Sequence, residues 1–340
     1  MKPESRDKYY LRQYADLHFP HGGIGYVDLE TILDQQGYLP VELSPAHQKN
    51  SSVVQRLFNA LRWISRLGKG STLVFIFPVY ARMNRLLLRL AARKKIHLIC
   101  ILADIDGVKD GSDSLLKKEL KFLKRFNSFI VHNAVMRQWL ESVFPSSDVA
   151  ELAFFDYLAE PVEHQRTPSP VIAFAGNLGK SGFLHKLDNL VTTSPELRFI
   201  LYGPALPEPI RGFPNCLFKG IVDPRLLPGL IEGSFGLVWD GDGLAEPEGS
   251  LGVYMGLISQ HKLSLYILSG LPVIIHSKAA MATFIQQHHL GLLVSDLHEI
   301  MGKIKALPEE SYQLMRSNMI PLAAKIGRGE CLRSALEALA

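Results

Sequence analysis

Short apolar runs alternate along the chain with segments whose apolar positions recur at intervals of three or four residues. Runs of the first kind are typical of buried strands and segments of the second kind of helices. The predicted strands are Leu73–Phe77, His97–Leu102, Ser128–His132, Val171–Gly176, Arg198–Gly203, Gly236–Asp240 and Pro272–His276. The predicted helices are Tyr26–Gln36, Val53–Leu67, Ala81–Lys94, Ser114–Phe126, His261–Ser269 and Ala279–His288. Because parallel strands are joined by crossover helices, this alternation predicts an α/β protein with doubly wound parallel sheets.

One segment breaks the alternation. Asp156–Pro170 contains three prolines and mixed charge without periodicity, which is typical of a linker. A new apolar strand follows at Val171, so we expect a second α/β domain to begin there. Two such domains would place a cleft at the carboxyl ends of their strands. The last helical segment, Ser311–Ala340, is expected to be interrupted at Pro321.

Composition narrows the class of protein. The chain has 340 residues, of which 47% are hydrophobic and 21% charged, as in globular proteins with cores. A net charge of +4 is too small to indicate nucleic acid as a partner. The three cysteines are far apart, which favours a reducing compartment over a disulfide framework or a structural zinc site. We find no signal peptide and no run long enough to span a bilayer, so we expect a cytoplasmic protein, or one peripheral to the inner face of the membrane.

The distribution of charge is uneven. No Asp or Glu occurs from Leu43 to Ala103, although eleven Lys and Arg residues do. Within this stretch Val54, Leu57, Phe58, Leu61 and Ile64 recur at helical spacing. One interpretation is an ordinary helix that packs its apolar face on a sheet and turns its arginines to water. The other is attraction of this surface to anionic lipid or to an anionic acceptor.

Two glycine clusters precede predicted helices. In the first, Gly22 and Gly23 lie before the helix that begins at Tyr26, but Asp28 occupies the third glycine position of a dinucleotide fingerprint. The second cluster, Gly176–Ser181, includes Asn177 and Lys180 and follows a strand directly. Its phosphate-loop pattern lacks the first glycine, which argues against a nucleoside triphosphatase. A ligand-free turn and a loop near a phosphate or sugar both remain open for these clusters.

Two further segments suggest phosphate chemistry. Asp240-Gly241-Asp242 resembles an Asp-x-Asp metal motif, although short acidic loops of this kind are commonly only solvated. A helix is predicted to begin near Lys262 and to end at Gly270. Its free amides, the Ser264 hydroxyl and the Lys262 ammonium could together hold a diphosphate. The alternative is an ordinary capped helix with an exposed lysine.

Several motifs carry a family resemblance. They are Phe174-Ala175-Gly176-Asn177, Phe235–Gly241, Gly252-Val253-Tyr254, His261–Tyr266, Gly270–Ile274 and, in the N-terminal half, Ala103–Gly107 and Val131-His132-Asn133. With them, the chain resembles a bacterial family of GT-B glycosyltransferases that includes Gtf3-like glucosyltransferases and β-1,6-galactofuranosyltransferases. The resemblance implies two Rossmann-like domains facing a cleft. It implies an acceptor-binding domain over residues 1–158, a nucleotide-sugar-binding domain over residues 159–319 and a helix over residues 320–340 that crosses back to the first.

The resemblance also implies roles for individual residues. The donor-binding positions would be Gly176, Asn177, Lys180, Gly203, Asp240, Gly241, Tyr254, Lys262 and Ser264, and the acceptor side would include Gly22, Gly23 and Asp28. Asp104 is the first candidate for the base that takes the acceptor proton, with Asp106 and Asp28 behind it; Lys262 would stabilise the leaving diphosphate. A helix or turn cap is the structural alternative for Asp104. No acid occurs in Ser277–Gln287, where retaining relatives often carry glutamates, and this favours inversion.

The expected function is transfer of a hexosyl group, galactofuranose or glucose, from a UDP-sugar to a glycan hydroxyl. The acceptor would be lipid-linked or protein-linked, in cell-surface polysaccharide, O-antigen or glycoprotein synthesis. No metal and no other cofactor are expected, and relatives suggest a homo-oligomer. The alternative is a catalytically silent GT-B subunit that binds a nucleotide sugar for a partner transferase. An NAD-dependent oxidoreductase is disfavoured because its glycine spacing is absent from both halves.

Overall fold

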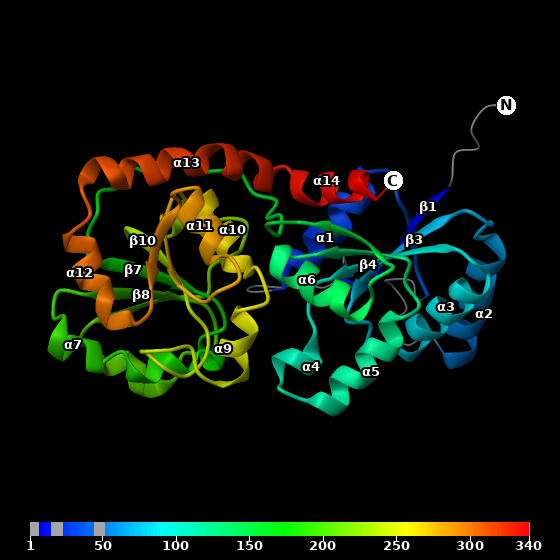
Figure 1. Ribbon diagram of the computed structural model, residues 1–340, viewed down its shortest axis with the longest axis horizontal. Coiled ribbons are helices and arrows are strands. Elements are labelled where there is room, and N and C mark those ends of the chain that lie inside the picture. The colour runs from blue at the N-terminus through cyan, green and yellow to red at the C-terminus, as the bar shows by residue number, and fades with distance from the viewer. Residues whose placement is uncertain (1–6, 15–22, 44–51, 340) are drawn as a thin grey trace. The chain divides into compact units, whose positions relative to one another are not determined.

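The computed structural model describes residues 7–14, 23–43 and 52–339. It divides into two compact units (Figure 1). Unit 1 takes the described residues of Met1–His18, Tyr26–Leu152 and Leu332–Ala340, and unit 2 takes those of Phe19–Gly25 and Ala153–Cys331. Each unit is built on a six-stranded sheet in which every pair of neighbouring strands is parallel.

The sheet of unit 1 has the order β2-β1-β3-β4-β5-β6. Its strands are β1 (Lys8–Leu11), β2 (Leu39–Val41), β3 (Thr72–Phe77), β4 (His97–Leu102), β5 (Ser128–Val131) and β6 (Asp148–Glu151). Its helices are α1 (Ile24–Gln35), α2 (Val53–Arg66), α3 (Arg82–Arg93), α4 (Asp106–Lys109), α5 (Asp113–Leu123) and α6 (Ala134–Val143). The order reverses between β1 and β3, and such a switch point opens a crevice at the carboxyl ends of the strands.

The sheet of unit 2 has the order β12-β11-β10-β7-β8-β9, the Rossmann arrangement. Its strands are β7 (Val171–Ala175), β8 (Arg198–Tyr202), β9 (Cys216–Gly220), β10 (Phe235–Val238), β11 (Val273–His276) and β12 (Gly291–Val294). Its α-helices are α7 (Asn189–Thr193), α8 (Leu227–Leu230), α9 (Gly249–Met255), α10 (His261–Leu268), α11 (Ala282–Gln287), α12 (Ile300–Lys305) and α13 (Glu309–Gly327). The switch point here lies between β7 and β10.

Both faces of the unit 2 sheet are buried. Ile172 and Phe174 of β7 belong to one apolar cluster, with residues of α12 and of the loop after β7, whereas Ala173 and Ala175 belong to another, with residues of α10, α11 and α13. Successive side chains of a strand point to opposite faces, so a strand covered on both sides must be apolar throughout. This explains why the central strands read as continuous apolar runs.

Most central elements agree with the sequence prediction, and the misses lie mainly at the sheet edges. The predicted strand His97–Leu102 coincides with β4, and the predicted strand Leu73–Phe77 differs from β3 by one residue. The prediction missed β1, β2, β6, β9 and β12. None of the five is buried along its whole length, and β2, β6 and β9 also lack a continuous apolar run.

One expectation about the helices was wrong. The last helix is not interrupted at Pro321, since α13 runs through this residue to Gly327, and α14 (Glu330–Ala338) begins after Gly329. Gly329 has a φ of 72°, a backbone conformation that glycine adopts without strain, and this explains the break. Of the two interpretations of α2, the one in which its apolar face packs on the sheet does not hold, because Val54, Leu57, Phe58 and Leu61 are exposed.

The predicted linker Asp156–Pro170 contains no helix or strand and belongs to unit 2. Backbone and side-chain bonds hold it on that unit. The Val162 amide donates to the Leu268 carbonyl at 2.9 Å, and the Arg166 guanidinium donates to the Ile231 carbonyl at 2.7 Å. Across the described ranges, no helix combines the length and the apolarity that crossing a bilayer requires.

Candidate functional site

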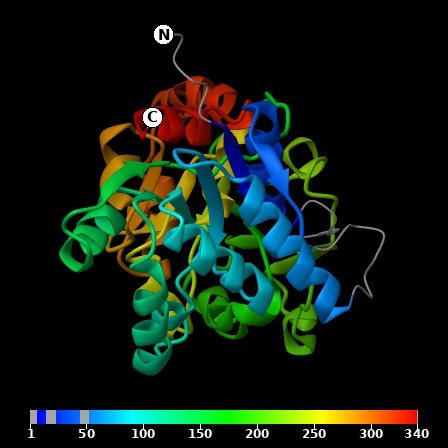
Figure 2. The ribbon, with the colours of Figure 1, turned by 90° about the vertical axis from the view of Figure 1, so that its right-hand side faces the viewer.

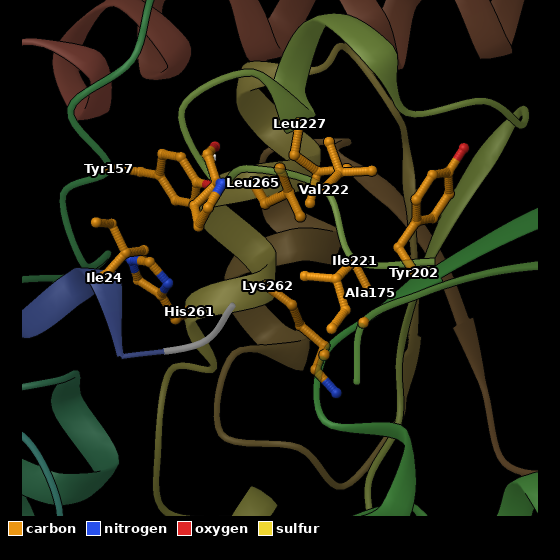
Figure 3. Close-up of a pocket in the computed structure, with 13 residues that line it drawn as sticks. Ile24, Tyr157, Ala175, Tyr202, Ile221, Val222, Leu227, His261, Lys262 and Leu265 are labelled. Atoms are coloured by element: carbon orange, nitrogen blue, oxygen red, sulfur yellow. Dashed lines mark hydrogen bonds between the residues drawn. The ribbon is translucent and has the colours of Figure 1, made fainter. Parts of the chain in front are cut away.

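A cavity of about 190 Å³ opens at the carboxyl-end edge of the unit 2 sheet (Figure 3). The loops after β7, β8 and β9 and the first turns of α8 and α10 surround it. Its wall is mostly apolar, with Tyr157, Ile221, Val222, Leu227 and Leu265 among the lining residues. In Figure 3 these side chains lie around the cavity. An apolar cavity with few polar groups suits a planar organic group such as a nucleobase.

Two glycines at the strand ends keep one wall of this cavity free of side chains. Gly176 follows β7 and Gly203 follows β8, with φ values of 157° and 131°. A Cβ atom on Gly203 would lie 1.8 Å from the Gly176 carbonyl oxygen, so no larger residue fits there. The two backbones approach closely because the Gly176 amide donates to the Tyr202 carbonyl at 3.0 Å. A ligand can therefore lie directly against the main chain.

Lys262 is the cation of the cavity. Its ammonium donates to the Asp240 carboxylate at 2.8 Å and to the Trp239 carbonyl at 3.3 Å, and it lies 4.4 Å from the centre of the Phe174 ring. Phe174 belongs to β7 and Asp240 follows β10, so this ammonium lies at the switch point of the sheet. The Lys262 side chain is only 13% exposed. In Figure 3 it extends away from Tyr157 toward Ala175.

The first turn of α10 borders the cavity, and no side chain caps it. The amino end of a helix attracts anions because its first amides lack helical partners. The ring of His261 stacks on Tyr157 with centres 5.0 Å apart, and its Nε2 lies 3.3 Å from the Asp156 carbonyl oxygen. The Ser264 hydroxyl donates to the Phe155 carbonyl at 2.5 Å and is 1% exposed. In this structure Ser264 therefore fastens α10 to the segment before the linker.

The other predicted donor-side residues lie in two further loops. Asn177 and Lys180 are exposed in the loop after β7, where residues 178–180 form a short 3-10 helix. Gly241 follows β10 with a φ of 98°, and a Cβ atom there would meet the Glu248 carbonyl at 2.3 Å. Tyr254 is buried in α9. Of the nine predicted donor-side positions, Gly176, Gly203 and Lys262 line the cavity itself.

Unit 1 has its own cluster of polar groups, around Asp104 in the loop after β4 and Asp106 at the start of α4. The Tyr26 hydroxyl donates to Asp104 Oδ2 at 2.9 Å, and the Lys109 ammonium lies 3.0 Å from the same oxygen. The Tyr80 hydroxyl donates to Asp106 Oδ2 at 2.7 Å. Both carboxylates therefore sit among donors that fix their orientation, and Asp104 keeps 22% of its side chain exposed.

Burial and negative charge act together on the neighbouring groups. Burial, and after it the charge of Asp104, raises the pKa of Tyr26 above its ordinary value. Burial likewise raises the pKa of Tyr80, with the hydrogen bond to Asp106 as the second cause. Burial lowers the pKa of His132 to about 4, although Asp104 acts in the opposite direction. Tyr26 and Tyr80 therefore keep their hydroxyl protons near pH 7 and can donate to Asp104 and Asp106.

The residues predicted for the acceptor side, Gly22, Gly23 and Asp28, are not among the groups described for this cluster. Gly22 lies outside the described residues. Gly23 precedes α1 with a φ of 94°, and Asp28 is fully buried within α1. The structure thus gives Asp28 no surface through which to meet a bulky acceptor.

Sequence reasoning missed a second cavity, of about 320 Å³, in unit 1. It lies beyond the carboxyl ends of β1, β2 and β3, and so beside the switch point of that sheet. Its lining includes Arg12, Gln13, Tyr14, Tyr80 and Asn84. The Asn84 amide donates to the Gln13 side-chain oxygen at 3.2 Å, which orders two planar polar groups in the wall. The signal was weak because β1 was not predicted and these residues are far apart in sequence.

The sequence suggested a possible metal motif at Asp240-Gly241-Asp242. Asp240 is ion-paired with Lys262, as described above. Among the residues that the structure describes, no group of three or more His, Cys, Asp or Glu side chains is arranged to hold a metal ion.

Comparisons with known proteins cover nearly the whole chain. The family model for the glucosyltransferase 3-like C-terminal domain matches residues 172–339, and the model for the N-terminal domain matches residues 9–143. Beta-1,6-galactofuranosyltransferase WbbI of Escherichia coli (strain K12) is 28% identical over 298 residues, which cover 84% of each chain. Glucosyltransferase 3 of Streptococcus gordonii is 33% identical over 155 residues, 45% of this chain and 42% of that relative.

Solved structures share the fold. Sucrose-phosphate synthase from Thermosynechococcus elongatus matches with a TM-score of 0.62 at 13% identity, covering 98% of this chain and 100% of that one. Anabaena HepE in complex with UDP matches with a TM-score of 0.63 at 13% identity, covering 96% and 100%. The predicted fold class, GT-B with two Rossmann-like parallel-sheet domains, is confirmed.

Proposed function

Because the chain belongs to the glucosyltransferase 3-like family of GT-B glycosyltransferases, we propose that it transfers a hexosyl group from a UDP-sugar to a glycan hydroxyl. The two relatives named above use galactofuranose and glucose according to their names, and the proposed sugar is one of these. Synthesis of a cell-surface polysaccharide, an O-antigen or a glycoprotein is the proposed setting.

The observation that carries the proposal is the position of Lys262 at the switch point of unit 2. An ammonium, an uncapped helix start and two side-chain-free glycine turns border one apolar cavity. The apolar wall suits a uracil base, and the cation suits the diphosphate attached to it. The comparison structure of Anabaena HepE contains UDP, and this supports a uridine nucleotide as the donor.

The proposed chemistry is a displacement at the sugar carbon. As the bond to the diphosphate breaks, negative charge grows on the leaving oxygens. Lys262 and the first amides of α10 would stabilise that charge, and single preorganised donors of this kind can contribute roughly 3 kcal/mol. These fixed donors make a metal unnecessary in the proposed mechanism. Removing divalent ions with EDTA should leave the transfer rate unchanged.

Asp104 is the proposed base in an inverting reaction. Its carboxylate would take the proton of the acceptor hydroxyl as that oxygen attacks the sugar carbon. Tyr26 and Lys109 fix the direction of one carboxylate oxygen. The polar cavity of unit 1 supports an acceptor with many hydroxyl groups, because Gln13 and Asn84 offer amides and Tyr14 and Tyr80 offer ring faces.

Donor binding can be tested before any acceptor is known. We expect UDP-sugars to raise the unfolding temperature of the chain more than GDP-, dTDP- or ADP-sugars do. A ligand that binds only the folded state at a hundredfold excess over its dissociation constant stabilises by about 2.7 kcal/mol. Equal responses to all four nucleotides, or none, would refute the proposed donor. Sedimentation velocity would test the homo-oligomer that is also part of the proposal.

One observation favours the alternative of a nucleotide-sugar-binding subunit without activity of its own. Asp104 Oδ2 already accepts a hydrogen bond from the Tyr26 hydroxyl at 2.9 Å and lies 3.0 Å from the Lys109 ammonium, so an acceptor hydroxyl would compete with both for this oxygen. Slow hydrolysis of the UDP-sugar in the absence of acceptor distinguishes the two functions. An active transferase should release free sugar, and the silent subunit should bind the donor and release none.

A further inference from the structure

The apolar side chains of α2 are turned toward solvent. Val53, Val54, Leu57, Phe58 and Leu61 are 71%, 76%, 40%, 65% and 52% exposed. At 100° per residue these five positions occupy one continuous stripe along the helix. We call this the α2 stripe. A stripe of this kind normally faces a protein core, so its exposure requires an explanation.

The opposite face of α2 fixes the helix on unit 1. Ala60 is fully buried there, the Asn59 amide donates to the Leu43 carbonyl at 3.1 Å, and the Trp63 indole donates to the Glu42 carbonyl at 3.0 Å. The Lys94 ammonium also donates to the Ile64 carbonyl at 2.7 Å. These four contacts hold the helix in one rotation, and the stripe therefore cannot turn inward without breaking them.

Exposed cations occur on α2 and on α3, the helix that packs against it (Figure 2). Arg62 and Arg66 of α2 are exposed, and the Arg66 guanidinium lies over the Trp63 ring. Arg82, Arg89 and Arg93 of α3 are exposed as well. Among the described residues, no carboxylate forms an ion pair with any of these five guanidinium groups. The sequence contains no Asp or Glu from residue 43 to residue 103, so the charge has no local compensation.

We propose that α2 binds the surface of an anionic phospholipid bilayer. The α2 stripe enters the boundary between headgroups and acyl chains, and the arginines of α2 and α3 bind the headgroup phosphates. A helix with an apolar face and cationic flanks lies in this interface parallel to the membrane. None of the residues of the α2 stripe lines either of the two cavities described above, and binding there needs no transferase activity.

A lipid surface fits better than a second copy of the chain. Two copies joined through this face would bring the same uncompensated arginines together, and like charges desolvated at an interface oppose association. A bilayer that contains anionic lipid supplies both the missing negative charge and an apolar layer that adapts to the shape of the stripe.

The test is co-sedimentation of the full chain with vesicles of phosphatidylcholine, with and without phosphatidylglycerol. The double variant Phe58→Ser/Leu61→Ser should lower binding to the anionic vesicles by about tenfold or more, because two large apolar groups no longer leave water. The matched control is Leu314→Ser/Ile320→Ser on α13, whose side chains are 54% and 53% exposed. It should bind as the wild type does.

A second variant tests the charges. Arg62→Gln/Arg66→Gln should weaken binding to anionic vesicles and reduce its dependence on salt, while the helix and its apolar stripe remain. Circular dichroism and thermal unfolding show whether each variant has folded. Transfer between a water-soluble donor and a water-soluble acceptor should be unchanged in all three variants.

Three results would overturn the proposal. One is equal binding to neutral and anionic vesicles, and another is an equal loss in the α13 control. The third is the absence of vesicle binding together with a concentration-dependent dimer that Phe58→Ser/Leu61→Ser dissociates, which would assign the stripe to a second copy. None of these results bears on donor binding, so the proposed function stands or fails separately.

Discussion

The carboxyl-end edges of the two sheets have opposite chemistry although the sheets share one architecture. The edge of unit 2 is apolar, contains two glycine turns and presents one lysine to its cavity. The edge of unit 1 is rich in tyrosines, amides and carboxylates. The strands that support both edges are similar runs of apolar residues. The difference therefore comes from the loops and helix starts beyond the strands, where Gly176, Gly203 and Lys262 lie in unit 2 and where Tyr80, Asp104 and Asp106 lie in unit 1.

This comparison separates what the fold provides from what the loops provide. Parallel sheets place strand ends together at a switch point, and any residues found there become neighbours. On the proposed function, the glycines and the lysine of unit 2 would bind a charged, flat ligand. The tyrosines and carboxylates of unit 1 would bind hydroxyl groups and move protons. The predictions below test whether the two edges are specialised in this way.

The largest expected effect is that of Asp104→Asn in unit 1. Loss of a general base should slow transfer by about 10²- to 10⁴-fold while the affinity for the UDP-sugar is retained. Initial-rate kinetics and calorimetric titration of the donor measure the two quantities. Asp113→Asn, at the exposed start of α5, is the control. An Asp104→Asn variant with wild-type kcat would make Asp104 a structural residue and remove the contrast.

Next in size is Lys262→Ala in unit 2. We expect kcat/KM for the UDP-sugar to fall by roughly 10²- to 10³-fold, because the leaving diphosphate loses its cation. The matched control is Lys303→Ala, which removes an exposed lysine of α12 in the same unit. Thermal unfolding shows whether both variants are folded. Near-normal turnover in Lys262→Ala would show that the diphosphate lies elsewhere.

A smaller effect is expected on the stability of the chain at acidic pH, through His132 of unit 1. The pKa of His132 is about 4 in the folded state, against 6.5 ordinarily, so between these values the unfolded chain binds the additional proton. This contribution to stability is present above pH 6.5 and is lost as the pH falls toward 4. From pH 6.5 to 5 it should lower the free energy of unfolding by up to about 2 kcal/mol.

Urea titrations at pH 7 and pH 5 measure this loss. The variant His132→Gln should lose less stability between the two pH values than the wild type does. The matched control is His185→Gln, which removes an exposed histidine of unit 2. Equal pH dependence in the wild type and in His132→Gln would contradict the assignment.

The smallest predicted effect is that of Tyr26→Phe. Removal of its hydroxyl takes one hydrogen bond from Asp104, and we expect kcat to fall by about 3- to 10-fold with an unchanged donor dissociation constant. Tyr38→Phe is the control, since Tyr38 is buried in unit 1 and none of the hydrogen bonds described for Asp104 involves it. A parallel loss in donor affinity would mean that Tyr26 acts through the fold as a whole.

The sequence predicted the central sheet well for a physical reason. Strands such as β4, covered on both faces, must be apolar at every position, and this pattern is visible without a structure. The edge strands β2 and β9 are partly exposed and have no such pattern. The spacing of apolar residues also cannot show which face of α2 packs against unit 1. The hydrogen bonds of Asn59 and Trp63 fix the orientation of that helix about its own axis.

For the candidate site too, the sequence could indicate some features and not others. Lys262, Gly176 and Asp104 could be named because each follows a strand or begins a helix. The pairing of Lys262 with Asp240 and the stacking of His261 on Tyr157 join residues that are 22 and 104 positions apart. Such contacts depend on strand order, which a local pattern does not contain. The cavity of unit 1 was missed for this reason.

The ion pair between Lys262 and Asp240 has a consequence for ligand selection. Folding has already restricted the torsional freedom of the lysine side chain, so an incoming anion loses little entropy by engaging it. The anion must, however, displace a carboxylate that already neutralises the ammonium. A monovalent ion such as chloride carries one charge, as that carboxylate does, whereas a pyrophosphate group carries more than one. The ligand-free enzyme would thus favour multiply charged anions over singly charged ones, independently of any contact with the base or the sugar.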